Sequence, residues 1–291
     1  LILFMEGGGA CLNTTTCLGN PQSFGESDLG TPGGALSRDL ENNPFKDWNL
    51  VYVPYCSGDI FTGNTMNGEG GRPQMGYNNL TEFLARIVPT FPDVNEVILS
   101  GSSAGGFGAA FNWMRVQDAF GDIPVHALDD SGPPMNGEFL TPCFQSYVAD
   151  LWGWADTLHP ACLDCDVEAG FVAEPMLHTA LARQNKGQRF GLMSYTEDNI
   201  IKLFFSFGLD ECASTKAFFA PPYPEGLFPR GLEALRDAAD RYGNSAVYII
   251  EGAEHTFLGG DLSRYESGGV NMLDWVTDFR DGAPGWDHVS P

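Results

Sequence analysis

One stretch, residues 97–111 with the sequence VILSGSSAGGFGAAF, constrains the fold of this chain more than any other. Residues 97–99 form the apolar run of a strand that is buried on both faces, and residues 106–114 have the spacing of a helix packed against it. Between them, residues 101–105 fit the pattern G-x-S-x-G. A strand, a tight turn and a helix in this order predict an elbow that holds Ser103 in a strained conformation at the sheet edge.

Strands and helices alternate along the rest of the chain. Apolar runs predict further strands at residues 1–5, 49–54, 125–128, 190–193 and 246–250. Apolar positions three and four apart predict helices at about 80–88 and 232–242. This order predicts an α/β fold with a mostly parallel twisted sheet, helices on both faces and right-handed crossovers. In such sheets the chemistry gathers beyond the carboxyl ends of the strands.

The 291 residues can bury one large core and contain no internal repeat, so we predict a single domain over residues 1–291. Residues from about 135 to 185 have poor helical periodicity, two tryptophans and three cysteines, which predicts a disulfide-tied helical cap inserted over the sheet edge. Because the chain opens directly in an apolar strand, we expect the natural protein to carry a further N-terminal segment with one or two more strands.

Acidic residues outnumber basic residues by 38 to 15, which gives a formal net charge of −23. A surface of that sign repels nucleic acid, so we exclude a nucleic-acid function. No apolar run approaches the roughly 20 residues that a membrane span requires, so we expect none. We further expect a monomer that uses no metal and no organic cofactor.

Seven cysteines favour an oxidised, secreted protein, extracellular or periplasmic, over a metal site. Cys11 and Cys17 bracket a short loop and are expected to form a disulfide. The C-x2-C spacing of residues 162–165 is typical of zinc or redox sites, but no second close pair completes such a site in that half. Pairing among Cys143, Cys162, Cys165 and Cys212 stays open, and Cys56 is left over as a free thiol or as the partner of a missing residue.

A serine alone is a poor nucleophile, so a base and a group that orients the base must come from other loops. Of the five histidines, His255 follows the last predicted strand, where its loop can reach the elbow, and we predict it as the base. His126 lies within a strand and is expected in the core. His159 and His178 fall in the cap, and His288 lies near the carboxyl terminus without a periodic context.

We predict Asp198, which follows the strand at 190–193, as the acid, because the order Ser103, Asp198, His255 is that of known hydrolases. Its neighbour Glu197 and the pair at residues 129–130 remain alternative positions, and we expect Asp130 to shape the pocket or to hold a loop. The N–H of Ala104 is one oxyanion donor by geometry. The glycine loop EGGGAC, after the first strand, is expected to supply the other.

These segments together resemble the pectin acetylesterase/Notum family of α/β-hydrolases, as a bacterial-type member. The resemblance rests on GGGAC with a second cysteine nearby, YCSGDIFTG, SGSSAGGFGAAF, DDSGPP, the aspartate of YTEDNII and the histidine of EHTF, in order across nearly the whole chain. It implies a catalytic triad and a set of oxyanion donors. These are Ser103, Asp198 and His255 for the triad and Gly9, Ala10 and Ala104 for the donors, with Asp130 as a pocket residue.

The resemblance also implies a serine carboxylic ester hydrolase with an acyl-enzyme mechanism, which we expect to deacetylate a polysaccharide such as pectin. An esterase for a hydrophobic or polymeric ester is the alternative, and an inactive carbohydrate-binding protein is a third interpretation. We expect Ser102, Trp152 and Trp154 in the pocket, because the tryptophan rings suit sugars as well as apolar esters. Ala10 stands where the family typically has tryptophan, which indicates a wider site.

Overall fold

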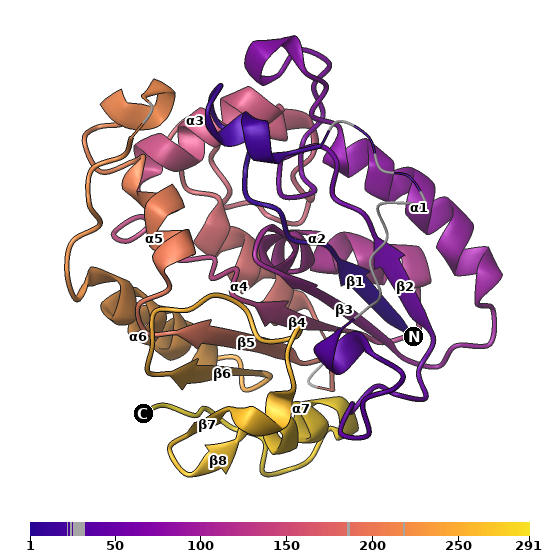
Figure 1. The fold of residues 1–291 in the computed structure, drawn as a ribbon. Coiled ribbons are helices and arrows are strands. Elements are labelled where there is room, and N and C mark those ends of the chain that lie inside the picture. Colours follow the sequence, from indigo (N-terminus) through magenta and orange to yellow (C-terminus); the bar gives the residue numbers. More distant parts are fainter. Residues whose placement is uncertain (22, 24, 26–32, 185–186, 218) are drawn as a thin grey trace.

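The centre of the fold is a sheet whose strands all run parallel (Figure 1). It is seen in a computed structural model that describes residues 1–21, 23, 25, 33–184, 187–217 and 219–291. Within that part of the chain, the six strands lie in the spatial order β2 (Leu50–Val53), β1 (Ile2–Met5), β3 (Val97–Ser102), β4 (Val125–Asp130), β5 (Phe190–Tyr195) and β6 (Ser245–Ile250).

Both faces of the sheet are buried, which explains why the strands are continuous apolar runs. In β1, Leu3 and Met5 point into one core, and Ile2 and Phe4 point into the other. Because successive side chains of a strand face opposite ways, a strand that is covered on both sides needs apolar side chains at nearly every position. The predicted strands are therefore found within three residues of their expected ends.

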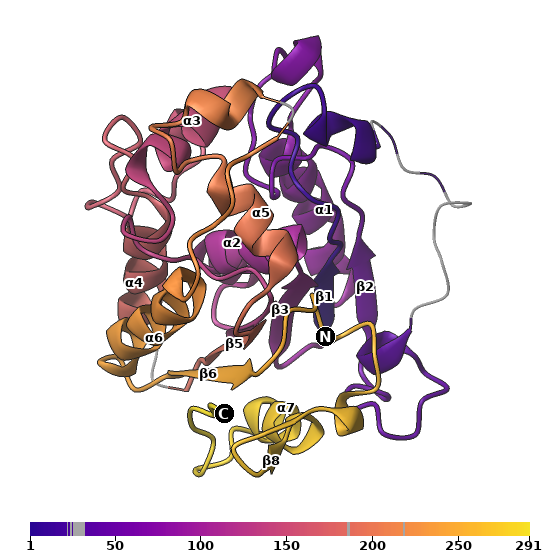
Figure 2. The same cartoon turned by 60° about the vertical axis from the view of Figure 1, so that its left-hand side comes forward.

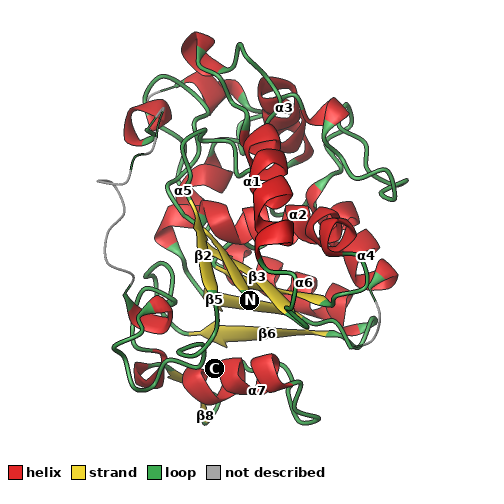
Figure 3. Ribbon diagram, turned by 90° about the vertical axis from the view of Figure 1, so that its right-hand side faces the viewer, coloured by secondary structure: helices red, strands yellow, loops and turns green. Residues whose placement is uncertain are grey.

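Helices cover each face of the sheet (Figures 2 and 3). One core is closed by α1 (Gly76–Thr90), α2 (Ala104–Phe120), α4 (Ala173–Arg183) and α6 (Leu227–Asp240). The other core is closed by α7 (Met272–Asp281), together with buried residues from segment 35–45. The prediction of a mostly parallel sheet with helices on both faces is confirmed.

The strand order reverses between β1 and β3. From β1 the chain crosses to β2 on one side, returns to β3 on the other side of β1, and then continues outward through β4, β5 and β6. Ligand sites of open parallel sheets lie at such a switch point, beyond the carboxyl ends of the strands. The loop after β1 and the turn after β3 meet there.

The cap combines two segments that are distant in the sequence. The predicted insertion, about 135 to 185, contains α3 (Pro142–Trp152) and all of α4. A second part, α5 (Asn199–Ser206) and the turn that follows it, comes after β5 and was not predicted. A disulfide between Cys143 and Cys212 joins the two segments. Residue 185, the predicted end of the cap, lies outside the described residues.

The structure also shows the state of the other cysteines. Cys11 pairs with Cys17 as predicted, Cys162 pairs with Cys165, and Cys56 is a half-buried free thiol. The C-x2-C segment is thus a disulfide in this structure. Over the described ranges, no group of three or more His, Cys, Asp or Glu side chains is arranged to hold a metal ion. Nor does any helix described there combine the length and apolarity that crossing a membrane requires.

Candidate active site

Ser103 occupies the sharp turn between β3 and α2. Its backbone has φ 60° and ψ −119°, which is a strained conformation for a residue with a side chain. A Cβ on Gly101 would lie 2.3 Å from the carbonyl oxygen of Gly105, and one on Gly105 would lie 2.0 Å from that of Met5. Both positions therefore require glycine, and the turn presents the serine at the switch point of the sheet.

Two sources of backbone N–H groups lie beside Ser103. Ala104 is the first residue of α2, so its N–H has no partner within the helix and lies at the positive end of the helix dipole. The glycine loop passes on the other side, because a Cβ on Gly7 would lie 3.2 Å from the Cβ of Ser103. Gly9 has φ 75°, a conformation that favours glycine.

Hydrogen bonds fix the backbone of the glycine loop before any substrate binds. The side-chain amide of Asn20 donates to the carbonyl oxygen of Gly8 over 2.6 Å, and the Tyr55 hydroxyl donates to that of Gly9 over 3.0 Å. The N–H of Cys11 donates to the carbonyl oxygen of Gly58 over 2.7 Å. Donors that are fixed in advance cost no reorganisation when charge develops, as an oxyanion site requires.

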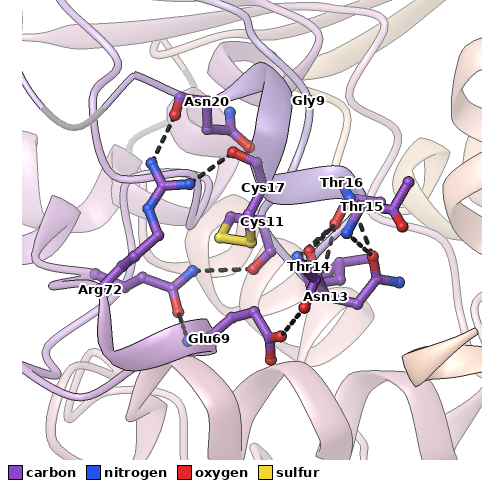
Figure 4. Close-up of a disulfide and its surroundings, with 12 residues drawn as sticks. Gly9, Cys11, Asn13, Thr14, Thr15, Thr16, Cys17, Asn20, Glu69 and Arg72 are labelled. Atoms are coloured by element: carbon purple, nitrogen blue, oxygen red, sulfur yellow. Dashed lines mark hydrogen bonds between the residues drawn. A yellow bond between two sulfur atoms is a disulfide. The ribbon is translucent and has the colours of Figure 1, made fainter. Parts of the chain in front are cut away.

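The disulfide between Cys11 and Cys17 closes the segment that follows this loop (Figure 4). Arg72 donates to the carbonyl oxygens of Cys17 and Asn20, each over 2.6 Å. Gln74 donates to the carbonyl oxygen of Cys11 over 3.0 Å. The covalent bond and these three hydrogen bonds anchor the loop to the segment before α1.

Asp198 and His255 are directly paired. The Nδ1 atom of His255 lies 2.7 Å from Oδ2 of Asp198, which is fully buried. The other carboxylate oxygen accepts the N–H groups of Ile200 and Ile201, each over 3.0 Å, and so caps the start of α5. The neighbouring Glu197 instead forms an ion pair with Lys202 over 2.6 Å.

The second ring nitrogen of His255 is left available. When Nδ1 carries the proton that the Asp198 carboxylate accepts, Nε2 of the neutral ring carries a lone pair. Nε2 is buried and has no hydrogen-bond partner among the described residues. No hydrogen bond joins Nε2 to the Ser103 hydroxyl among the described residues; in free enzymes such contacts are often long and tighten when substrate binds. In that tautomer, Nε2 is the atom that can accept a proton.

The remaining histidines have local partners. His126 accepts the N–H of Arg189 at Nδ1, lies 2.9 Å from Glu96 at Nε2, and has a pKa lowered by burial, as fits the core position expected for it. His159 lies 2.9 Å from Asp118 in the cap. The other two, His178 and His288, lie 3.8 Å from Glu174 and 3.6 Å from Asp240.

An apolar cavity opens beside Ser103. Its volume is about 60 Å³. Gly9, Ala10 and Ala104 line one end, and the walls include Phe107, Trp152, Trp154 and Phe205. Apart from Ser103 and Gln145, the lining has no hydroxyl or amide side chain, and the Gln145 amide is occupied by backbone groups of the cap.

Of the four predicted pocket residues, the structure places two in this cavity and two elsewhere. Trp152 and Trp154 line it, and their indole N–H groups donate to the Cys11 carbonyl oxygen and the Thr62 hydroxyl, so the rings present apolar surface. Ser102 and Asp130 do not line it. They bond to each other over 2.7 Å, since the side chain of Ser102 points along the sheet edge toward β4.

Asp129 carries a buried carboxyl that plays no part in this geometry. One oxygen accepts the N–H of Gly132 over 2.7 Å, and the other is buried without a partner among the described residues. Burial raises the pKa of Asp129 well above its usual value, the bond from Gly132 opposes that shift, and the charge of Asp130 adds to it. Asp129 is therefore protonated over a wider pH range in the folded protein than in the unfolded chain.

Asp129→Asn is expected to change how stability depends on pH. An unfolded aspartate ionises near pH 3.9, whereas folded Asp129 stays protonated to higher pH. The wild-type protein therefore loses stability as the pH rises from about 4 through the folded pKa, and the variant lacks that loss. Urea unfolding at a series of pH values should show that the free energy of unfolding of the variant increases relative to that of the wild type as the pH rises. If the free energies of unfolding of the two proteins changed in parallel with pH, the raised pKa of Asp129 would be contradicted.

Comparison with known proteins finds a family and several relatives for this chain. A family model described as Pectinacetylesterase matches residues 1–162. The palmitoleoyl-protein carboxylesterase notum2 of Xenopus laevis is 34% identical over 148 residues, which are 45% of this chain and 30% of that protein. The human palmitoleoyl-protein carboxylesterase NOTUM is 31% identical over 153 residues, 48% of this chain and 30% of its own length. The matched part thus spans less than a third of these relatives.

The fold has a counterpart among solved structures. The Wnt deacylase Notum from Drosophila superposes with a TM-score of 0.69 and covers 97% of this chain and 84% of its own. The two sequences are 19% identical in that superposition, so the likeness concerns the fold.

Proposed function

The chain belongs to the pectinacetylesterase family, and from that premise we propose that it is a carboxylic ester hydrolase that forms an acyl-enzyme on Ser103. The observation that carries the proposal is the pair of His255 and the buried Asp198, 2.7 Å apart, whose loops leave the same sheet edge as the elbow. A serine at such a turn needs this kind of base to become a nucleophile.

The reaction then follows the usual course of acyl transfer. Nε2 of His255 takes the proton of the Ser103 hydroxyl as its oxygen attacks the ester carbonyl. The N–H groups of Ala104 and of the glycine loop, at Gly9 and Ala10, stabilise the oxyanion. Asp198 orients the imidazole and stabilises its charged form. The protonated His255 gives its proton to the departing alcohol, and water repeats the sequence on the acyl-enzyme.

The cavity belongs to the acyl side of the substrate. The alcohol must leave beside His255, because Nε2 protonates it. The cavity touches Ser103 and Ala104, whereas His255 is absent from its lining. It therefore suits the acyl chain of the ester.

We infer an acyl group longer than acetyl. A water molecule occupies about 10–15 Å³ of such a cavity, so a single methyl group leaves most of the 60 Å³ empty. The apolar walls favour a hydrocarbon chain. The relatives named as palmitoleoyl-protein carboxylesterases support the same choice.

Removal of acetyl groups from a polysaccharide such as pectin is the second candidate, because the family description names it. Pectin is a polyanion, however, and a protein of net charge −23 repels it at low salt. A disused scaffold that only binds carbohydrate is the weakest interpretation, since the Asp198–His255 pair and the strained serine are both present.

The disulfides bear on where the enzyme works. Three of them join six of the seven cysteines, and such bonds persist in oxidising compartments. We therefore propose a secreted enzyme. The acidic surface supports the further proposals that it acts as a monomer and does not bind nucleic acid.

A panel of p-nitrophenyl esters from acetate to dodecanoate tests the acyl proposal. Each buried methylene contributes about 0.8 kcal/mol, so we expect kcat/KM to rise about fourfold per methylene until the cavity is full. Ala173→Leu, which adds volume to the cavity wall, should move the optimum to shorter chains and leave acetate within about threefold. Ala169→Leu, at an exposed position of the cap, is the control. A profile that falls steadily from acetate would favour the acetyl candidate instead.

A further inference from the structure

Asp130 is buried at the end of β4 and its carboxylate is surrounded by donors. It is fully buried, and its two oxygens accept the N–H groups of Phe257 and Leu258 over 2.9–3.0 Å. They also accept the hydroxyls of Ser102 over 2.7 Å and of Ser131 over 3.2 Å. Four groups from three segments of the chain thus converge on one carboxylate.

The same residue contacts both sides of the proposed site. Its backbone carbonyl oxygen accepts the N–H of Ser103 over 2.7 Å, and its side chain holds the two residues that follow Thr256. Ser131 adds a link, because its hydroxyl accepts the N–H of Thr256 over 3.3 Å. Asp130 therefore connects the elbow to the loop that carries His255.

That loop needs to be held. Thr256, directly after His255, has φ 64°, which is unfavourable for a β-branched residue. Strain of this kind persists only where the surroundings impose it. The N–H groups that follow, at Phe257 and Leu258, both point at Asp130. The conformation of the loop thus depends on those bonds.

The chemistry of the position favours a carboxylate over an amide. An ionised carboxylate only accepts hydrogen bonds, and all four neighbours can donate. Burial raises the pKa of Asp130, whereas the bonds from Leu258, Ser102 and Phe257 oppose that shift. An amide of the same shape has one accepting oxygen instead of two, so it would place an N–H₂ group where a carboxylate oxygen now accepts hydrogen bonds.

We propose that Asp130 is a positioning residue that fixes His255 relative to Ser103 through these hydrogen bonds. The inference rests on the proposed function, since it concerns the alignment of the proposed base and nucleophile. Of the two roles expected for Asp130, shaping the pocket or holding a loop, the proposal takes the second, because Asp130 does not line the cavity. It acts through Phe257 and Leu258 and does not touch the substrate.

The test compares two conservative variants of adjacent buried carboxylates. Asp130→Asn should lower kcat by about 10- to 100-fold with KM within about twofold, because small misplacement of a catalytic group costs up to about 10²-fold. Asp129→Asn makes the same chemical change one residue away, where no bond reaches the His255 loop, and should keep kcat within about twofold. Steady-state kinetics with p-nitrophenyl butyrate and thermal unfolding are measured for both.

These measurements separate positioning from general destabilisation. A merely structural role would lower the Tm and leave kcat per folded molecule unchanged, whereas a positioning role lowers kcat with little change in KM. If Asp130→Asn does not fold, Ser102→Ala, which removes one of the four donors, should still lower kcat by about three- to tenfold. Equal kcat for the Asp129 and Asp130 variants, or an unchanged Ser102→Ala enzyme in that case, would overturn the proposal. If Ser103→Ala lost activity while one of these results overturned the role of Asp130, the proposed function would still hold.

Discussion

Ser103→Ala is expected to lower kcat for ester hydrolysis by about 10⁶-fold, the loss seen when the nucleophile of a catalytic triad is removed. The acyl-enzyme cannot form without the hydroxyl oxygen. The fold should survive, because the bond that holds the elbow runs from the backbone N–H of Ser103 to the Asp130 carbonyl oxygen and does not involve the hydroxyl. Turnover of p-nitrophenyl butyrate and the thermal unfolding midpoint measure the two effects.

Ser100→Ala is the matched control for that variant. Ser100 lies in the same strand, is buried, and its hydroxyl donates to the Leu128 carbonyl oxygen over 2.8 Å. It is remote from the proposed chemistry, so kcat should stay within about twofold. A fluorophosphonate probe should label wild type and Ser100→Ala but not Ser103→Ala. Retained hydrolysis or labelling in Ser103→Ala would refute the assignment of the nucleophile.

Asp198→Asn is expected to lower kcat by about 10⁴-fold with little change in KM. An amide at this position favours the wrong tautomer of His255 and no longer stabilises its charged form. The start of α5 should be preserved, because asparagine caps helices as well as aspartate does and can still accept the N–H groups of Ile200 and Ile201. Steady-state kinetics and thermal unfolding together separate the catalytic effect from a structural one.

Glu197→Gln provides the comparison for Asp198→Asn. Glu197 is the adjacent carboxylate, but it pairs with Lys202 near the surface. Such a pair contributes at most about 1 kcal/mol of stability, and its loss should leave kcat unchanged. If Glu197→Gln lost activity and Asp198→Asn kept it, the acid would be Glu197, and the pair of Asp198 and His255 would not belong to the working site.

Most of the strands and the elbow could be predicted because each has a pattern of its own. The run at 97–99 and the glycines around Ser103 identify a strand and an elbow without reference to the rest of the chain. α7 has an equally clear pattern that was overlooked, with Met272, Trp275, Val276 and Phe279 at positions i, i+3, i+4 and i+7. α5 is eight residues long and mostly apolar, and so short a run does not distinguish a helix from a strand.

The partners of the polar side chains were harder to predict. Asp198 and Glu197 are neighbours with the same chemistry, and only the direction in which each side chain leaves the backbone determines which one meets His255. The role of Asp130 depends on N–H groups 127 and 128 residues away. Backbone donors carry no mark in a sequence, because every residue except proline has one.

The sequence by itself determined the strand and helix order, the elbow, the expectation of a base after the last strand and the short disulfide between Cys11 and Cys17. These depend on local periodicity, on glycine where a side chain would clash, and on short separations along the chain. Only the tertiary structure decided that the cap has two segments joined by Cys143 and Cys212, that an apolar cavity opens beside Ser103, and that Asp130 bonds to the His255 loop. These depend on how distant segments approach one another, and burial and hydrogen bonding across such contacts are properties of the packed chain.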